Sequence, residues 1–183
     1  EPTFGGINLE DIKAPECFLV ERACRERMNI PVFHDDQHGT AICVAAAVRN
    51  GLRVVGKELS EVRLVCSGAG AAALACLDLL VGLGLSEQNV TVVDLDGVIY
   101  RGREAGMNPF NARWAKETEQ RSLAEAMVGA DVFLGLSAGG VLKGDMVARM
   151  AERPLILALA NPDPEIMPEE AKLAKPDAVI ATG

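Results

Sequence analysis

The sequence predicts an α/β protein with a doubly wound, mostly parallel sheet that is covered by helices on both faces. Two observations support this fold class. From residue 60 onward, short apolar runs alternate with helical segments. The runs are apolar nearly throughout, which is typical of parallel strands buried between two layers of helices. We expect these strands over residues 62–66, 90–94, 132–136, 155–160 and 178–181.

Four helices are expected to connect the strands. Their helical patterns cover residues 71–83, 123–128, 144–150 and 168–173. Residues 95–103 predict a turn or small hairpin around Asp96-Gly97, a pair that is common in hairpin turns. The next segment, up to residue 120, is polar and predicts no regular element.

The first fifty residues follow a different pattern. Residues 1–14 are expected to form loops, and a helix is predicted to begin at Pro15, because proline is favoured in the first helical turn. A short extended run at 30–33 leads into an acidic segment. From Thr40 the chain is apolar nearly all round, which predicts a buried helix that Asn50-Gly51 ends.

Composition and charge exclude several classes of function. The chain has 183 residues, of which 49% are hydrophobic, so it can bury one sizeable core. Its net charge of -8 and pI near 4.8 argue against nucleic-acid and anionic-membrane partners, which need a basic surface. No apolar stretch reaches the roughly 20 residues that span a bilayer. The five cysteines are isolated and predict free thiols, so we expect a soluble cytoplasmic protein.

A glycine-rich turn follows the first strand of the alternating region. Ser67, Gly68, Ala69, Gly70, Ala71 and Ala72 fit the order strand, G-x-G-x-x-A, helix. In this motif the glycines permit a tight turn and a close approach of backbone amides to a pyrophosphate, which lies at the positive end of the next helix. The alternative is a tight turn without a ligand. The motif in this context predicts a Rossmann-like, dinucleotide-binding sheet.

Asp94 closes the next strand, about 24 residues beyond Gly70, where a ribose-binding carboxylate is expected. A carboxylate there accepts a hydrogen bond from the adenosine 2′-hydroxyl and repels a 2′-phosphate. It therefore favours NAD over NADP. Arg101 and Arg103 lie close by in the sequence and leave NADP as the alternative.

An acidic segment stands between two apolar stretches. Residues 34–38 read HDDQH, and a second acidic pair, Glu10-Asp11, lies upstream. Carboxylates set beside apolar surface are costly unless a cation offsets them, and Mg²⁺ and Mn²⁺ prefer carboxylate oxygens. Glu10, Asp11 and one of Asp35 and Asp36 are candidate metal ligands. The alternatives are an ordinary solvated pair for Glu10-Asp11 and helix capping for Asp35-Asp36.

The same segment also mimics the zinc-protease pattern H-E-x-x-H, with aspartate in place of glutamate. That pattern needs His34 and His38 on one helical face. Pro31 lies before the segment and Gly39 after it, so we expect no helix to span the two histidines. They are expected to be loop residues that shape the site.

Two further candidates follow strands of the predicted sheet. Asn161 comes after the strand at 155–160, and Ser137 comes after the strand at 132–136. Ligands of such sheets bind at the carboxyl ends of the strands. The amide of Asn161 is expected to hold a nicotinamide ribose or a substrate carboxylate; the alternative is an asparagine favoured by the turn before proline. Ser137 is expected to line the same crevice.

Taken together, these segments resemble the malic enzymes, in particular the bacterial type. The resemblance covers essentially the whole chain and is carried by EPTFGGINLEDI at residues 1–12, FHDDQHGTA at 33–41, CSGAGAAA at 66–73, GADVFLGLS at 129–137 and LALANP at 157–162. It implies that Glu10, Asp11 and Asp36 bind Mg²⁺ or Mn²⁺, that Asp35 supports them without touching the ion, and that Asn161 lies near nicotinamide and substrate.

The resemblance also implies a reaction, the oxidative decarboxylation of (S)-malate to pyruvate and CO₂ with reduction of NAD or NADP. The family's general acid and base, a tyrosine and a lysine, belong to an N-terminal region that has no match here. We therefore expect residues 1–183 alone to be inactive. Residues 1–50 are expected to carry metal-site loops and to join that N-terminal domain, and residues 51–183 to form an NAD(P)-binding domain truncated at its C-terminus. A homo-oligomer is implied for the full protein. The alternatives are the cofactor domain of another dehydrogenase, such as an amino-acid dehydrogenase, and a non-catalytic nucleotide-sensing module.

Overall fold

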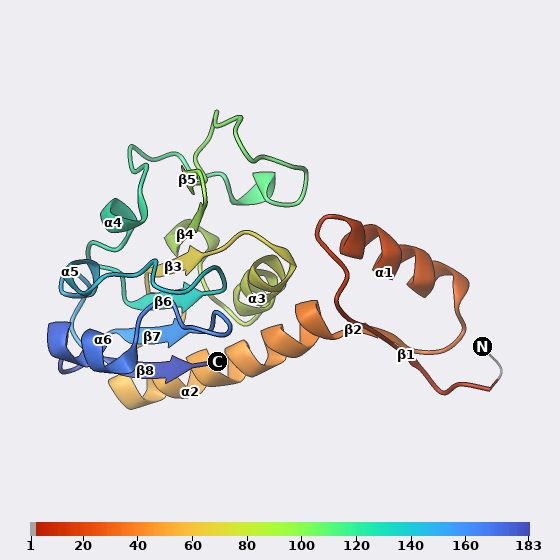
Figure 1. The fold of residues 1–183 in the computed structure, drawn as a ribbon, viewed down its shortest axis with the longest axis horizontal. Coiled ribbons are helices and arrows are strands. Elements are labelled where there is room, and N and C mark those ends of the chain that lie inside the picture. The colour runs from red at the N-terminus through yellow and green to blue at the C-terminus, as the bar shows by residue number, and fades with distance from the viewer. Residues whose placement is uncertain (1–2) are drawn as a thin grey trace.

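A computed structural model describes residues 3–183; Glu1 and Pro2, the first residues of the family-like N-terminal stretch, lie outside the described residues. The main sheet has six strands in the order β5-β4-β3-β6-β7-β8 (Figure 1). All neighbouring strands are parallel except for the pair β4 and β5. The strands are β3 (Leu64–Ser67), β4 (Val90–Asp94), β5 (Gly97–Val98), β6 (Val132–Gly135), β7 (Leu155–Ala158) and β8 (Val179–Thr182). The predicted α/β class and mostly parallel sheet are confirmed.

Alternate residues of the strands face two separate cores. In β3, Leu64 and Cys66 belong to the core on one face of the sheet, and Val65 belongs to the core on the other. The first core includes residues of α2 (Thr40–Val55) and α3 (Ala71–Gly82). The second includes residues of α4 (Leu123–Ala126), α5 (Gly144–Val147) and α6 (Pro168–Ala174). The near-continuous apolar runs are therefore explained by burial on both faces, as predicted.

The helix from Thr40 is longer than predicted. Asn50-Gly51 does not end it; α2 continues to Val55 and ends at Gly56, in the left-handed region with φ 68°. The glycine at 51 has a packing role instead. A Cβ atom there would lie 2.7 Å from Leu155 Cδ1, so glycine lets α2 pack closely on β7. The sequence pattern alone does not distinguish a glycine required for close packing from one that ends a helix.

The N-terminal segment is also more ordered than predicted. Strand β1 (Ile7–Leu9) lies within the expected loop and pairs in parallel with β2 (Val32–His34), so the prediction of loops throughout 1–14 is wrong. Helix α1 (Glu16–Arg27) connects the two strands, and this small unit lies beside the main sheet (Figure 1). Leu9 and His34 are partners in the register. The acidic pairs Glu10-Asp11 and Asp35-Asp36 follow β1 and β2, so they begin next to each other at the same end of this two-stranded sheet.

A packed loop follows β5 and fills the stretch for which no element was predicted. The expected hairpin around Asp96-Gly97 is confirmed by the antiparallel pairing of β4 and β5. Beyond it lies a short 3-10 turn, η3 (Ala112–Trp114), with Trp114 buried in the first core. A second 3-10 turn, η2 (Glu87–Asn89), precedes β4. Within residues 3–183, no helix combines the length and apolarity that a membrane crossing requires.

Candidate active site

A crevice of about 880 Å³ opens at the carboxyl ends of the central strands. The chain turns in opposite directions after β3 and β6, because β3 is followed by β4 on one side of this pair and β6 is followed by β7 on the other. Parallel α/β sheets bind ligands at this kind of switch point. Predicted residues that line the crevice are Ser67, Gly68, Ala69, Gly70, Asp94 and Ser137. Ala71 and Ala72 form the first turn of α3 and are not among its lining residues.

The glycine-rich turn between β3 and α3 has the geometry of a phosphate site. Gly68 has φ 119°, and a Cβ atom there would lie 2.4 Å from Leu136 O, so only glycine fits. Gly70 stands at the N-terminus of α3, where no side chain caps the helix. The first amides of this 12-residue helix thus remain available for an anion.

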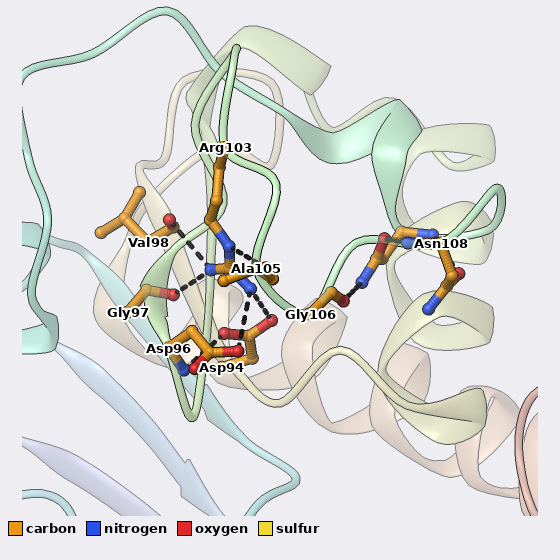
Figure 2. Close-up of polar contacts among 9 residues, drawn as sticks. Asp94, Asp96, Gly97, Val98, Arg103, Ala105, Gly106 and Asn108 are labelled. Atoms are coloured by element: carbon orange, nitrogen blue, oxygen red, sulfur yellow. Dashed lines mark hydrogen bonds and ion pairs between the residues drawn. The ribbon is translucent and has the colours of Figure 1, made fainter.

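Asp94 lies at the end of β4 and pairs with a buried arginine (Figure 2). The Arg103 side chain is only 3% exposed, and its guanidinium bonds the Asp94 carboxylate. Its Nη1 donates to the carbonyls of Gly97 (2.9 Å) and Val98 (3.1 Å), and its Nε donates to Ala105 O (2.8 Å). Arg103 is therefore an internal anchor for the loop behind the crevice and is not free to reach a ligand.

Asn161 is placed differently from Ser137. Ser137 is exposed on the crevice wall, and its Oγ lies 2.9 Å from Ser67 Oγ. Asn161 lines a neighbouring hollow of about 520 Å³, together with Gly139 and Asp163. In this structure the asparagine and the phosphate turn are thus not brought into one cavity.

The two acidic loops meet at the ends of β1 and β2. The Asp11 backbone amide donates to Asp36 Oδ2 at 2.8 Å, and His34 Nδ1 lies 4.0 Å from the same oxygen. Glu10 and Asp35 are exposed. Among residues 3–183, no three His, Cys, Asp or Glu side chains converge in a way that could hold an ion. The structure therefore brings the predicted metal loops together without arranging their carboxylates as a ligand set.

No helix contains both histidines, as predicted, because His34 is the last residue of β2 and the helical turn begins at Asp35. The expectation that both are loop residues is wrong, since His38 lies within that turn. Residues Asp35–Gly39 form a π-helical turn, η1, that runs directly into α2. His34 precedes it as a buried side chain, and in the described part of the chain neither of its ring nitrogens has a hydrogen-bond partner. The side chains of Asp35 and Asp36 make no capping bond to either helix, so direct side-chain capping is not their role.

Helix α1 holds this π-helical turn in place through one carboxylate. Glu21 Oε1 lies 2.7 Å from His38 Nε2, and Glu21 Oε2 accepts a hydrogen bond from Gln37 Nε2 at 3.1 Å. Gln37 is buried. His38 is thus engaged with α1, which leaves it unsuited to pair with His34 on a zinc ion.

The cysteines nearest the phosphate turn are unreactive by environment. Burial raises the pKa of the Cys76 thiol to about 12 and raises that of Cys66 further. A protonated thiol is a poor nucleophile and a poor metal ligand. All five cysteines are free, and these two serve the core.

Two residues of the crevice region were not predicted from the sequence. Arg121 lines the crevice wall, and Glu165 bonds Ser137. For Arg103 the sequence suggested a nucleotide contact, and its role as an anchor of Asp94 was not predicted. No short-range pattern marks these roles.

Comparison with known proteins decides the family. The family described as "Malic enzyme, NAD binding domain" matches residues 37–183. This chain belongs to the malic enzyme family. The NAD-dependent malic enzyme of Rhizobium meliloti (strain 1021) is 67% identical over 183 residues, which are all of this chain and 24% of that protein. The NADP-dependent malic enzyme of Haemophilus influenzae is 61% identical over 184 residues, again all of this chain and 24% of that protein.

A solved structure agrees with the family. The crystal structure of the NAD-dependent malic enzyme from Thermotoga maritima superposes with a TM-score of 0.93 at 44% identity, over 100% of this chain and 49% of that chain. The present chain spans about a quarter of the length of its curated malic enzyme relatives. Membership in the malic enzyme family excludes the alternative of an amino-acid dehydrogenase and identifies the chain as an NAD(P)-binding domain. It does not choose the nucleotide, because the relatives include NAD- and NADP-dependent malic enzymes.

Proposed function

We propose that residues 1–183 are the cofactor-binding part of an enzyme that converts (S)-malate to pyruvate and CO₂ while it reduces NAD(P). The crevice at the switch point carries this proposal, because it joins the phosphate turn, the ribose carboxylate Asp94 and Ser137 in one cavity. Family membership supports the malate chemistry. The substrates are small molecules, and no nucleic-acid or membrane partner is proposed.

The residues of the crevice would bind and orient the nucleotide. The backbone amides at the N-terminus of α3 would hold the pyrophosphate. Asp94, on the β4 side of the turn, would accept a hydrogen bond from the adenosine ribose. Ser137 and the loop that carries Asn161 would contact the nicotinamide half. When bound, the nicotinamide would supply the hydride acceptor for malate oxidation.

The acidic loops are proposed to hold Mg²⁺ or Mn²⁺ through Glu10, Asp11 and Asp36, with Asp35 as a support. Their chemistry fits a hard cation, since each offers carboxylate oxygens and the two loops touch at the bond from Asp11 to Asp36. When bound, the ion supplies Lewis-acid polarisation of the substrate oxygen during decarboxylation.

NAD is the proposed nucleotide. Asp94 and Asp96 both lie at the ribose end of the crevice, and Arg103 uses its donors inside the protein. A 2′-phosphate would therefore meet two carboxylates without compensation from Arg103.

Residues 1–50 are proposed to join an N-terminal domain that supplies the acid and base, and residues 51–183 to form the nucleotide domain. The isolated chain is then inactive, and the full-length enzyme works as a homo-oligomer. Five free cysteines fit a reducing cytoplasm.

Calorimetric titration of the chain with NAD, with and without Mn²⁺ and malate, tests this proposal. We expect NAD to bind and Mn²⁺ with malate to tighten its binding. A full-length enzyme carrying this sequence should reduce NAD in the presence of malate, and the isolated chain should not. NAD binding that ignores metal and malate, together with no turnover by the full-length protein, would support a nucleotide sensor instead.

A further inference from the structure

A fully buried carboxylate lies beneath the crevice, between the loops that follow β6 and β7. Glu165 is 0% exposed. Its Oε1 accepts hydrogen bonds from Ser137 N (2.9 Å) and Ser137 Oγ (3.2 Å), and its Oε2 accepts one from Ala160 N (3.1 Å). Every partner is a donor, which suits a carboxylate because its oxygens only accept. One side chain thus fixes both loops at the nicotinamide side of the crevice.

The backbone around Glu165 leaves room for this carboxylate. Gly135 is the last residue of β6, and a Cβ atom there would lie 2.3–2.6 Å from the three carboxyl atoms of Glu165. Any larger residue would displace the carboxylate. The absence of a side chain at Gly135, at the end of β6, therefore makes the space that the Glu165 carboxylate occupies.

The bonds to Glu165 determine the direction of the hydrogen bonds between the two serines. A hydroxyl has one proton, and that of Ser137 goes to Glu165. In the pair of Ser67 Oγ and Ser137 Oγ, 2.9 Å apart, Ser67 must therefore donate. Ser137 Oγ keeps one free lone pair, and this serine is exposed in the crevice. It can only accept a hydrogen bond from a ligand.

An acceptor at this position distinguishes the parts of a dinucleotide. Phosphate oxygens only accept hydrogen bonds, whereas ribose hydroxyls and the nicotinamide carboxamide nitrogen can also donate them. Ser137 lies in the loop after β6 (Val132–Gly135), and β6 is separated from β4, which ends at the ribose carboxylate Asp94, by β3. The nicotinamide half of the nucleotide would extend to this side.

We propose that Glu165 is a positioning residue that makes Ser137 a hydrogen-bond acceptor for the nicotinamide half of NAD(P). The inference rests on the proposed nucleotide function of the crevice. It assigns the two parts of the nucleotide to different groups. Backbone amides bind the pyrophosphate, and Ser137, oriented by Glu165, accepts hydrogen bonds from the nicotinamide riboside.

Two variants test this division in a full-length enzyme that carries this sequence. Ser137→Ala removes the acceptor. Glu165→Gln replaces one carboxylate oxygen by an amide NH₂, which then faces either the Ala160 amide or Ser137. Where it faces Ser137, the NH₂ donates to Ser137 Oγ, so the serine proton is no longer directed to residue 165. We expect both variants to lower the NAD affinity about 3- to 10-fold, which corresponds to one lost hydrogen bond. The affinity for ADP, which lacks the nicotinamide riboside, should change less than about twofold.

Matched controls separate this effect from general loosening. Glu170→Gln alters a carboxylate that also accepts a backbone amide, that of Gly144 at 3.1 Å, but lies outside the crevice. Ser86→Ala alters a serine away from the crevice. Both should leave the NAD and ADP affinities unchanged. A double-mutant cycle should show that the two effects are not additive, because both act through one hydroxyl.

The outcomes separate the inference from the proposed function. Equal losses of NAD and ADP affinity in Ser137→Ala, or no loss at all, would overturn the role of Ser137 and Glu165 while the wild type still binds NAD. A wild type that binds neither nucleotide would overturn the proposed function and this inference with it. If Glu165→Gln fails to fold, Ser137→Ala alone decides, since it leaves both backbone bonds to Glu165 in place.

Discussion

The Arg103 guanidinium bonds the Asp94 carboxylate where β4 ends and the crevice begins (Figure 2). The pair directs the positive charge of Arg103 into the protein. The other Asp94 oxygen, Oδ1, accepts a hydrogen bond from the backbone amide of Asp96 at 2.9 Å. The carboxylate is thus held firmly at the ribose end of the crevice. The arginine that suggested NADP from the sequence is instead the residue that positions the carboxylate favouring NAD.

The first prediction concerns nucleotide choice. In a full-length enzyme, Asp94→Asn should lower the NAD affinity about tenfold or more, because a hydrogen bond to a charged acceptor contributes about 1.5–3 kcal/mol. The NADP affinity should rise, since the charge that repels the 2′-phosphate is removed. Calorimetric dissociation constants for both nucleotides measure the change. Asp145→Asn, at the exposed start of α5, is the control. A wild type that prefers NADP would contradict the assignment.

The second prediction concerns Arg103 as an anchor. Arg103→Met should destabilise the protein by about 3 kcal/mol, because it leaves a partly buried carboxylate and three carbonyls without their donor. Urea unfolding measures the free energy. Arg101→Met is a matched control, since the Arg101 side chain is exposed and only its backbone amide is bonded, to Lys116 O. Equal stability of the two variants would show that the Arg103 pair is not structural.

The third prediction concerns the support of the acidic turn. Glu21→Ala removes both bonds to η1 and leaves the Gln37 amide, which is 4% exposed, without a partner. The expected loss of stability is about 1–3 kcal/mol. The Mn²⁺ affinity should also fall several-fold, because Asp36 lies in the loosened turn. Thermal unfolding and Mn²⁺ titration measure the two effects. Glu26→Ala, exposed on the same helix, is the control and should change neither quantity. An unchanged Mn²⁺ affinity in Glu21→Ala would show that the position of η1 does not affect metal binding.

The sequence predicts the parts of this fold that depend on local periodicity. The strand at 90–94 was placed correctly to the residue, because an apolar run buried on both faces has a sharp beginning and end. The phosphate turn was also placed correctly, since its glycines are adjacent in the chain. In both cases the physical cause lies within a few residues.

Features that depend on contacts between distant residues were not predicted. Gly51 serves packing against Leu155, and β1 exists only because β2 pairs with it. Glu165 acts through Ser137, which belongs to the loop after β6 and lies 28 residues earlier in the chain. The same limit applies to Asn161, whose place beside a separate hollow depends on how two loops pack. Sequence patterns indicate which residues gather at the strand ends, but not which of them share a cavity.

The short helix α4, behind the crevice wall, begins with a capping box. Ser122 Oγ accepts the Glu125 amide at 3.3 Å, and Glu125 Oε2 accepts the amides of Ser122 (2.9 Å) and Arg121 (2.6 Å). These backbone hydrogen bonds, that from Arg121 first, lower the pKa of Glu125 below its ordinary value of 4.5. Ser122 and Arg121 both line the crevice, so this carboxylate also holds part of the site.

The fourth prediction follows from the sign of that shift. A carboxylate whose pKa is lower in the folded than in the unfolded state stabilises the fold above its unfolded pKa, and the contribution disappears as the pH falls through the folded value. Glu125→Gln should therefore unfold at a lower temperature than the wild type at pH 7. The gap should shrink as the pH falls below about 4.5. Scanning calorimetry at pH 7, 5 and 3 measures it, with Glu119→Gln, an exposed neighbour, as the control. If the difference in unfolding temperature between the wild type and Glu125→Gln stayed constant from pH 7 to 3, the charge of Glu125 would not stabilise the fold. A stabilisation that depends on the ionised carboxylate must disappear when the carboxylate is protonated.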